Sequence, residues 1–75
     1  MNAPSSEQYY RDLDLVVDLA SKNEGLVNIP AIANEMLLRY PLPDGVLLDY
    51  EAHVLSTAIR QNVAVLFDRS SVATA

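Results

Sequence analysis

The sequence contains no cysteine and no tryptophan, and it has only two glycines and one histidine. Without cysteine the chain can form neither a disulfide nor a thiolate metal site, which fits a reducing compartment. Gly25 and Gly45 stand far apart, so the chain lacks the glycine-rich loop that cradles a phosphate. The single histidine has no aligned nucleophile and no second imidazole near it. We therefore expect no enzymatic activity, no bound metal and no cofactor.

Basic residues are also scarce, with five Lys and Arg against ten Asp and Glu, which gives a net charge of −5. Proteins that bind nucleic acid use clustered positive charge against the phosphates. Here the bases are scattered along the chain as Arg11, Lys22, Arg39, Arg60 and Arg69. We therefore expect that nucleic acid is not the main partner.

Long apolar runs are absent too. The longest covers residues 63–67, whereas a membrane-spanning helix needs about 20 apolar residues. The first residues do not show the charged and then apolar pattern of a signal peptide. We expect a cytoplasmic protein that does not bind a membrane.

What the chain has in abundance is apolar residues, at 51%, arranged with helical periodicity. The clearest helix covers residues 28–40. Asn28 can cap it, Pro30 suits its first turn, and Pro41 ends it. Its apolar residues share one face, which consists of Ile29, Ile32, Ala33, Met36, Leu37 and Tyr40.

Two further helices are predicted around this one. The first covers residues 6–22 and ends before Gly25, with an apolar stripe of Tyr9, Leu13, Val16, Val17 and Ala20. The other starts between Val46 and Asp49, with Asp49 as a good N-cap, and runs to about Asn62. Its predicted apolar face is Leu47, Leu48, Val54, Leu55, Ala58 and Ile59.

These helices predict an all-α fold, a compact three-helix domain of helix-turn-helix-like character with room for a fourth element. The chain of residues 1–75 is one domain, with flexible tails at 1–4 and 69–75 and a turn at 41–45. Residues 63–67 allow two interpretations. They extend the third helix, or they form a short strand for which Leu26 and Val27 are the best partner.

Two groups of polar residues could carry chemistry. Asp49 and His53 are four residues apart, as in a carboxylate-oriented base or metal ligand, but a solvent-facing imidazole is the favoured interpretation. Asp12, Asp14 and Asp18 could be read as a metal cluster, but a hard cation needs more oxygen ligands than these. A solvated acidic face is favoured there.

Several apolar side chains do not fit the predicted core. Leu15 and Leu19 lie one turn apart outside the stripe of the first helix, and Leu38 lies opposite the stripe of the central helix. We predict a partner-binding surface in which Tyr10, Leu15, Leu19 and Leu38 make apolar contacts while Asp14 and Asp18 attract a basic partner. The alternative is that another segment of the chain covers these leucines.

Residues 25–37, GLVNIPAIANEML, are similar to the helix-turn-helix segments of bacterial regulators. The next helix would be the DNA-recognition helix. It departs from the DNA-binding pattern because it carries Asp49 and Glu51 and only Arg60 as a base. In size and acidic character the chain resembles the small antiactivators of rhizobial quorum sensing.

This resemblance implies a protein that binds a transcriptional activator. The activator would be of the LuxR type, or one that switches on excision of an integrative conjugative element. The resemblance assigns no individual residue. Two other interpretations remain open, a small DNA-binding helix-turn-helix regulator and a self-associating structural module, and the sequence leaves the oligomeric state undecided.

Overall fold

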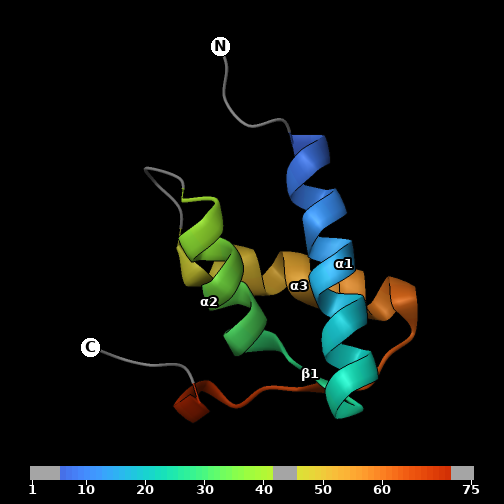
Figure 1. Cartoon of the computed structure of the whole chain (residues 1–75). Coiled ribbons are helices and arrows are strands. Elements are labelled where there is room, and N and C mark those ends of the chain that lie inside the picture. Colours follow the sequence, from blue (N-terminus) through green and yellow to red (C-terminus); the bar gives the residue numbers. More distant parts are fainter. Residues whose placement is uncertain (1–5, 42–45, 72–75) are drawn as a thin grey trace.

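The computed structural model describes residues 6–41 and 46–71 of the chain. Three helices dominate it, α1 (Ser6–Glu24), α2 (Ile29–Arg39) and α3 (Leu47–Gln61). Figure 1 shows α1 and α2 side by side, with α3 crossing behind both. The other elements are short, namely β1 (Val27–Asn28), β2 (Val65–Leu66) and the 3-10 turn η1 (Arg69–Ser71). The predicted all-α, three-helix fold is confirmed.

Two residues with left-handed backbone end α1 and α3. Gly25 follows α1 with φ +80, and its N–H donates to the Ser21 carbonyl at 2.8 Å. Asn62 follows α3 with φ 60, and its N–H donates to the carbonyl of Ile59 at 3.0 Å. Both give their helix the usual left-handed C-terminal cap. The role predicted for Gly25 is confirmed.

Of the two N-caps predicted from the sequence, Asn28 is right in position only, and Asp49 is wrong. Asn28 does occupy the position before α2, but its side chain makes no capping hydrogen bond. The residue before α3 is Val46, and Asp49 lies inside the first turn of that helix. Asp49 still favours the helix start, because a negative charge complements the positive end of the helix dipole.

The core contains the predicted faces of α1 and α2. Side chains from both helices, from β1 and from α3 are fully buried there, among them Leu13, Val17, Val27, Ile29, Ala33, Met36, Val54 and Ala58. Close packing of these apolar side chains is the main stabilising contribution in a domain of this size.

The predicted apolar face of α3 is partly wrong. Leu48 and Ile59 are 67% and 68% exposed, whereas Tyr50 and Thr57 are both only 2% exposed. The buried face is therefore rotated toward Tyr50. This residue can be buried because its hydroxyl donates a hydrogen bond to the backbone carbonyl of Tyr40.

The segment after α3 forms a strand rather than an extension of the helix. β2 pairs with β1 in parallel, with Val65 opposite Val27 and Leu66 opposite Asn28. The N–H of Val27 donates to the carbonyl of Ala64 at 2.9 Å. Of the two interpretations that the sequence allowed, the pairing with Val27 is correct. It brings residues 63–71 beneath α1 and α2 (Figure 1).

The ordered part of the chain extends beyond the C-terminal limit that the sequence predicted. Residues 69–71, assigned from the sequence to a flexible tail, form η1 instead. Arg69 anchors them through an ion pair of 2.6 Å to Glu51, whose side chain is buried. The predicted tail residues 1–4 and 72–75 lie outside the described residues, and so do residues 42–45 of the turn predicted at 41–45. Among the helices within 6–41 and 46–71, none is long and apolar enough to cross a membrane.

Candidate protein-binding surface

The outward side of α1 carries two exposed leucines. Leu15 is 54% exposed and Leu19 is 48% exposed, one helical turn apart. Leu13 and Val17, on the opposite side of the same helix, are fully buried. No described segment covers the two leucines, so that alternative is wrong for this part of the chain. Leu15 and Leu19 together are called the leucine ridge below.

One open groove adjoins the leucine ridge where α3 ends against α1. Leu15 lies on its edge, and the other lining residues are Arg11, Asp14, Asp18, Arg60 and Gln61. Arg60 donates to the carboxylate of Asp14 at 2.7 Å, and the Gln61 side chain donates to the backbone carbonyl of Asp14 at 3.0 Å. Three of the predicted contact residues, Asp14, Leu15 and Asp18, therefore share one groove.

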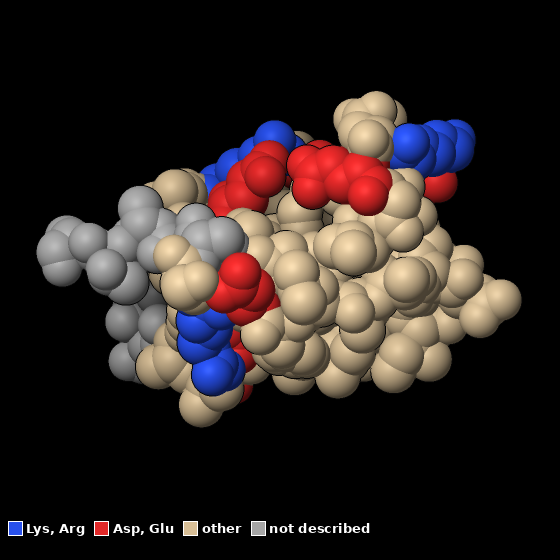
Figure 2. All heavy atoms as spheres, turned by 90° about the horizontal axis from the view of Figure 1, so that it is seen from below, with Lys and Arg blue, Asp and Glu red and all other residues tan. Residues whose placement is uncertain are grey.

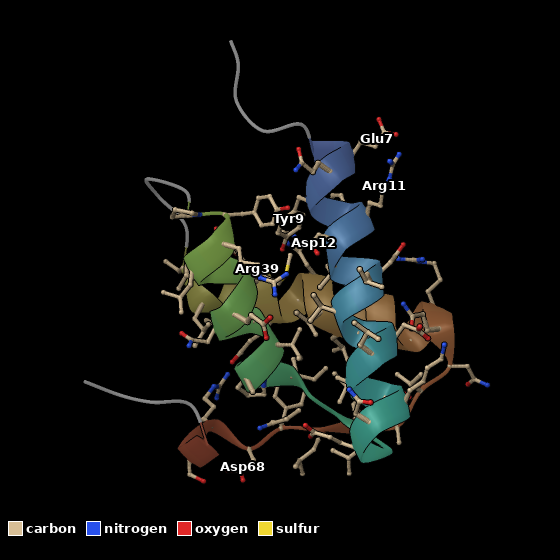
Figure 3. The ribbon with its side chains drawn as sticks, in the orientation of Figure 1. Glu7, Tyr9, Arg11, Asp12, Arg39 and Asp68 are labelled. Atoms are coloured by element: carbon tan, nitrogen blue, oxygen red, sulfur yellow. The ribbon has the colours of Figure 1, made fainter. Side chains whose placement is uncertain are left out.

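A second groove lies on the other side of Leu15, between α1 and α2. It is lined by Gln8, Arg11, Asp12, Leu15 and Tyr40. Asp12 and Arg39 point toward each other across the two helices, with Nη1 3.0 Å from Oδ2 (Figure 3). The hydroxyl of Tyr40 donates to the same carboxylate at 3.2 Å. Partial burial and this hydrogen bond raise the pKa of Tyr40.

Every basic side chain of the protein is paired with a carboxylate of the same chain. In addition to the contacts above, Arg11 pairs with Glu7 at 2.7 Å and Lys22 pairs with Asp18 at 3.1 Å. Among the described residues the pairs are Arg11–Glu7, Lys22–Asp18, Arg39–Asp12 with Glu35, Arg60–Asp14 and Arg69–Glu51. The acids predicted to attract a basic partner are thus partly neutralised. Exposed pairs are worth only about 0–1 kcal/mol, so a partner can compete for them.

Tyr10 lies away from the leucine ridge, in a cluster that contains all four tyrosines and the only histidine. Its ring centroid is 4.9 Å from that of Tyr9 and 5.6 Å from that of His53, and both contacts are edge-to-face. Tyr10 is 43% exposed. It therefore belongs to the side of α1 that faces α3.

His53 is not the solvent-facing imidazole that the sequence favoured. It is half-buried, and its Nδ1 lies 2.9 Å from the hydroxyl of Tyr9. Burial, with smaller contributions from Tyr10 and Tyr50, raises the pKa of Tyr9 to about 12. No local pattern joins Tyr9 to a histidine on another helix, so sequence reasoning missed this contact.

Leu38 is the most exposed of the six predicted residues, at 73%. It lies on α2 opposite the buried Met36 and lines neither of the grooves beside Leu15. The structure therefore separates the predicted surface into the α1 ridge with its two acids, the aromatic cluster with Tyr10, and Leu38.

Within the described parts of the chain, no three His, Cys, Asp or Glu side chains lie close enough together to hold a metal ion. Comparisons of the sequence and structure with protein-family models, curated proteins and solved structures found no match. The fold and surface define a small all-α domain with internally paired charges and an exposed leucine ridge. Its function has to be inferred from these residues.

Proposed function

We propose that the protein is an antiactivator, which binds a transcriptional activator and inhibits it by protein–protein interaction. The leucine ridge carries this proposal, because two half-exposed leucines stand one turn apart and Leu15 adjoins two grooves that charged and other polar residues line. An apolar centre with a polar rim is the usual anatomy of a protein interface. The two grooves provide that rim on either side of Leu15.

The charge distribution supports a protein partner over DNA. The net charge is −5, and a DNA phosphate would have to displace a carboxylate from each basic side chain. A DNA-binding activator presents a positively charged surface, which the excess acid attracts. Binding there would also shield the activator from its DNA. The resemblance to small rhizobial antiactivators points to a LuxR-type activator or an excision activator.

The test is an affinity capture from the native host with tagged wild-type protein and identification of the bound proteins by mass spectrometry. The test variant carries Leu15→Ser together with Leu19→Ser. The matched control is Leu48→Ser, which changes a leucine of similar exposure on α3. We expect one transcriptional activator, in comparable molar amount, with the wild type and the control but not with the double variant.

Two further measurements make the result decisive. Circular dichroism and thermal unfolding should be the same for the double variant and the wild type, because neither leucine belongs to the core. The purified protein should repress transcription from a reporter that depends on the captured activator. An activator that is captured equally well by the double variant would rule out the leucine ridge as its binding surface.

The competing function is DNA binding by the helix-turn-helix-like segment. It predicts that the protein retards a DNA duplex at low salt and that Arg39→Gln and Arg60→Gln abolish the retardation. We expect no retardation. A salt-dependent shift that is lost in these two variants would overturn the antiactivator proposal.

A further inference from the structure

β2 has one open edge. The N–H of Val27 donates to the carbonyl of Ala64, and the N–H of Asp68 donates to Oδ1 of Asn28 at 3.0 Å. In the segment of residues 64–68, the backbone N–H and C=O groups of alternate residues, Ala64, Leu66 and Asp68, therefore face β1. Val65 and Phe67, which alternate with these residues, direct their N–H and C=O groups away from β1.

The side chains at this edge are apolar and accessible. Val65 is 41% exposed, Leu66 is 44% exposed and Phe67 is 51% exposed. Proteins usually protect such an edge by keeping the strand very short or with a charge, a proline or a bulge. β2 is short, with two residues, but residues 65–67 contain no charge and no proline. Figure 2 shows this side of the molecule, where charged side chains lie along the margins and the middle of the face carries none.

The other strand has no comparable edge. β1 packs against both α1 and α2, and Val27 is fully buried. The described sheet therefore offers a single edge for pairing with another strand. If the added strand came from an identical chain, its own open edge would be used in the same contact, so the association would stop at two copies.

We propose that β2 pairs with β2 of a second copy of this chain. The two strands run antiparallel about a twofold axis at Leu66, which produces a four-stranded sheet across the dimer. In this register Val65 lies opposite Phe67 of the second copy. These are the residues whose backbone groups point outward, so each pair can exchange two hydrogen bonds.

Each copy carries a net charge of −5, but this register places no like charges directly opposite each other. Leu66 faces Leu66 of the second copy at the centre. Asp68 lies opposite Ala64 of the second copy, and Arg69 lies opposite its Val63. Neither pair therefore brings two charges of the same sign together.

The side chain of Asn28 holds the residues after β2 in the extended conformation that this contact needs. Its side-chain amide accepts from the N–H of Asp68 at 3.0 Å and donates to the carbonyl of Asp68 at 3.1 Å. This pair continues the ladder beyond Leu66 and holds the segment extended up to Asp68. A pre-ordered edge loses less conformational freedom on binding than a mobile one.

A single cysteine tests the register, because the natural chain has none. In the proposed dimer Leu66 forms a non-hydrogen-bonded pair with its copy, with Cα atoms about 4.5 Å apart, within the range of a disulfide. Leu66→Cys should therefore form a disulfide-linked dimer rapidly under mild oxidation. Leu48→Cys, an exposed position on α3, should react much more slowly. Equal rates would contradict the proposal.

Sedimentation of the full chain at concentrations from roughly 10 μM to 1 mM, which suits a small interface, tests the association itself. We expect a concentration-dependent dimer that Leu66→Lys weakens about tenfold or more, because two like charges then meet at the axis. The control Leu48→Lys should dimerise normally, and so should the variant with Leu15→Ser and Leu19→Ser. This separates the result from the test of the leucine ridge.

Three outcomes would overturn the proposal. The wild type could remain monomeric throughout, or Leu66→Lys could leave a dimer unchanged. The third is a monomer whose captured partner is lost on Leu66→Lys, which would show that a strand of another protein occupies the edge. Circular dichroism of Leu66→Lys confirms that any loss of association is not a loss of fold.

Discussion

Arg69 donates two hydrogen bonds to the buried carboxylate of Glu51, at 2.6 Å from Nη2 and 3.1 Å from Nε. Glu51 is only 3% exposed, and a buried carboxylate needs a partner to offset its lost hydration. The contact fastens η1 to α3 and raises the pKa of Arg69, so the guanidinium stays charged at any practical pH. It joins the end of the described chain to the core.

We predict that Arg69→Met destabilises the protein and lowers Tm by about 5 °C or more, because it leaves a buried carboxylate without its cation. The double variant Glu51→Gln with Arg69→Met should lose clearly less, since the buried group is then neutral. Thermal unfolding by circular dichroism measures both values. Equal losses in the two variants would show that the ion pair itself is not responsible.

The partly buried hydroxyl of Tyr9 predicts a loss of stability at alkaline pH. Its pKa is raised from 10.0 to about 12 in the folded protein, so the unfolded chain releases this proton first. Stability is therefore highest below about pH 10 and falls as the pH rises toward about 12. Because the hydroxyl is only partly shielded from water, we expect a loss on the order of 1 kcal/mol.

Urea unfolding at several pH values in this range measures that loss, and Tyr9→Phe is the control. The variant has no proton to release at this position, so its stability should fall less steeply with pH than that of the wild type. A contribution from Tyr40, whose pKa is also raised, remains in both proteins and cancels in the comparison. Identical slopes would contradict the assignment to Tyr9.

Leu13 and Leu15 form a matched pair on α1, because they are two residues apart on opposite sides of the helix. Leu13 is fully buried and Leu15 is 54% exposed. Leu13→Ala should reduce the free energy of unfolding by about 3 kcal/mol, since it leaves a cavity. Leu15→Ala should change it by less than about 0.5 kcal/mol. Denaturant unfolding of both variants tests this, and a large loss at Leu15 would place it in the core.

The backbone at Gly25 favours glycine for conformational reasons alone. Its φ is +80, and a Cβ added there would meet nothing within 4 Å. Gly25→Ala should therefore cost about 1 kcal/mol through backbone strain without any steric clash. Gly25→Asn should cost less, because asparagine tolerates this conformation, as it does at Asn62. If both variants were as stable as the wild type, the cap would not require a left-handed residue.

The sequence by itself determined the number and order of the helices and the buried faces of the first two. These features depend on neighbouring residues, such as Gly25 after α1 and Pro30 at the start of α2. The position of Leu15 and Leu19 outside the apolar stripe was also predictable, but their exposure was not, because the sequence left open whether another segment covers them.

Only the tertiary structure decided how polar side chains are buried. The faces of α3 could not be read from periodicity, because Tyr50 and Glu51 are buried only where Tyr40 and Arg69 meet them. The contact between Tyr9 and His53 likewise joins residues on different helices. Asn28 forms hydrogen bonds to Asp68 instead of capping α2. A polar group can be buried only where folding brings a hydrogen-bonding partner close to it. That partner is often distant in the sequence, so neighbouring residues do not reveal it.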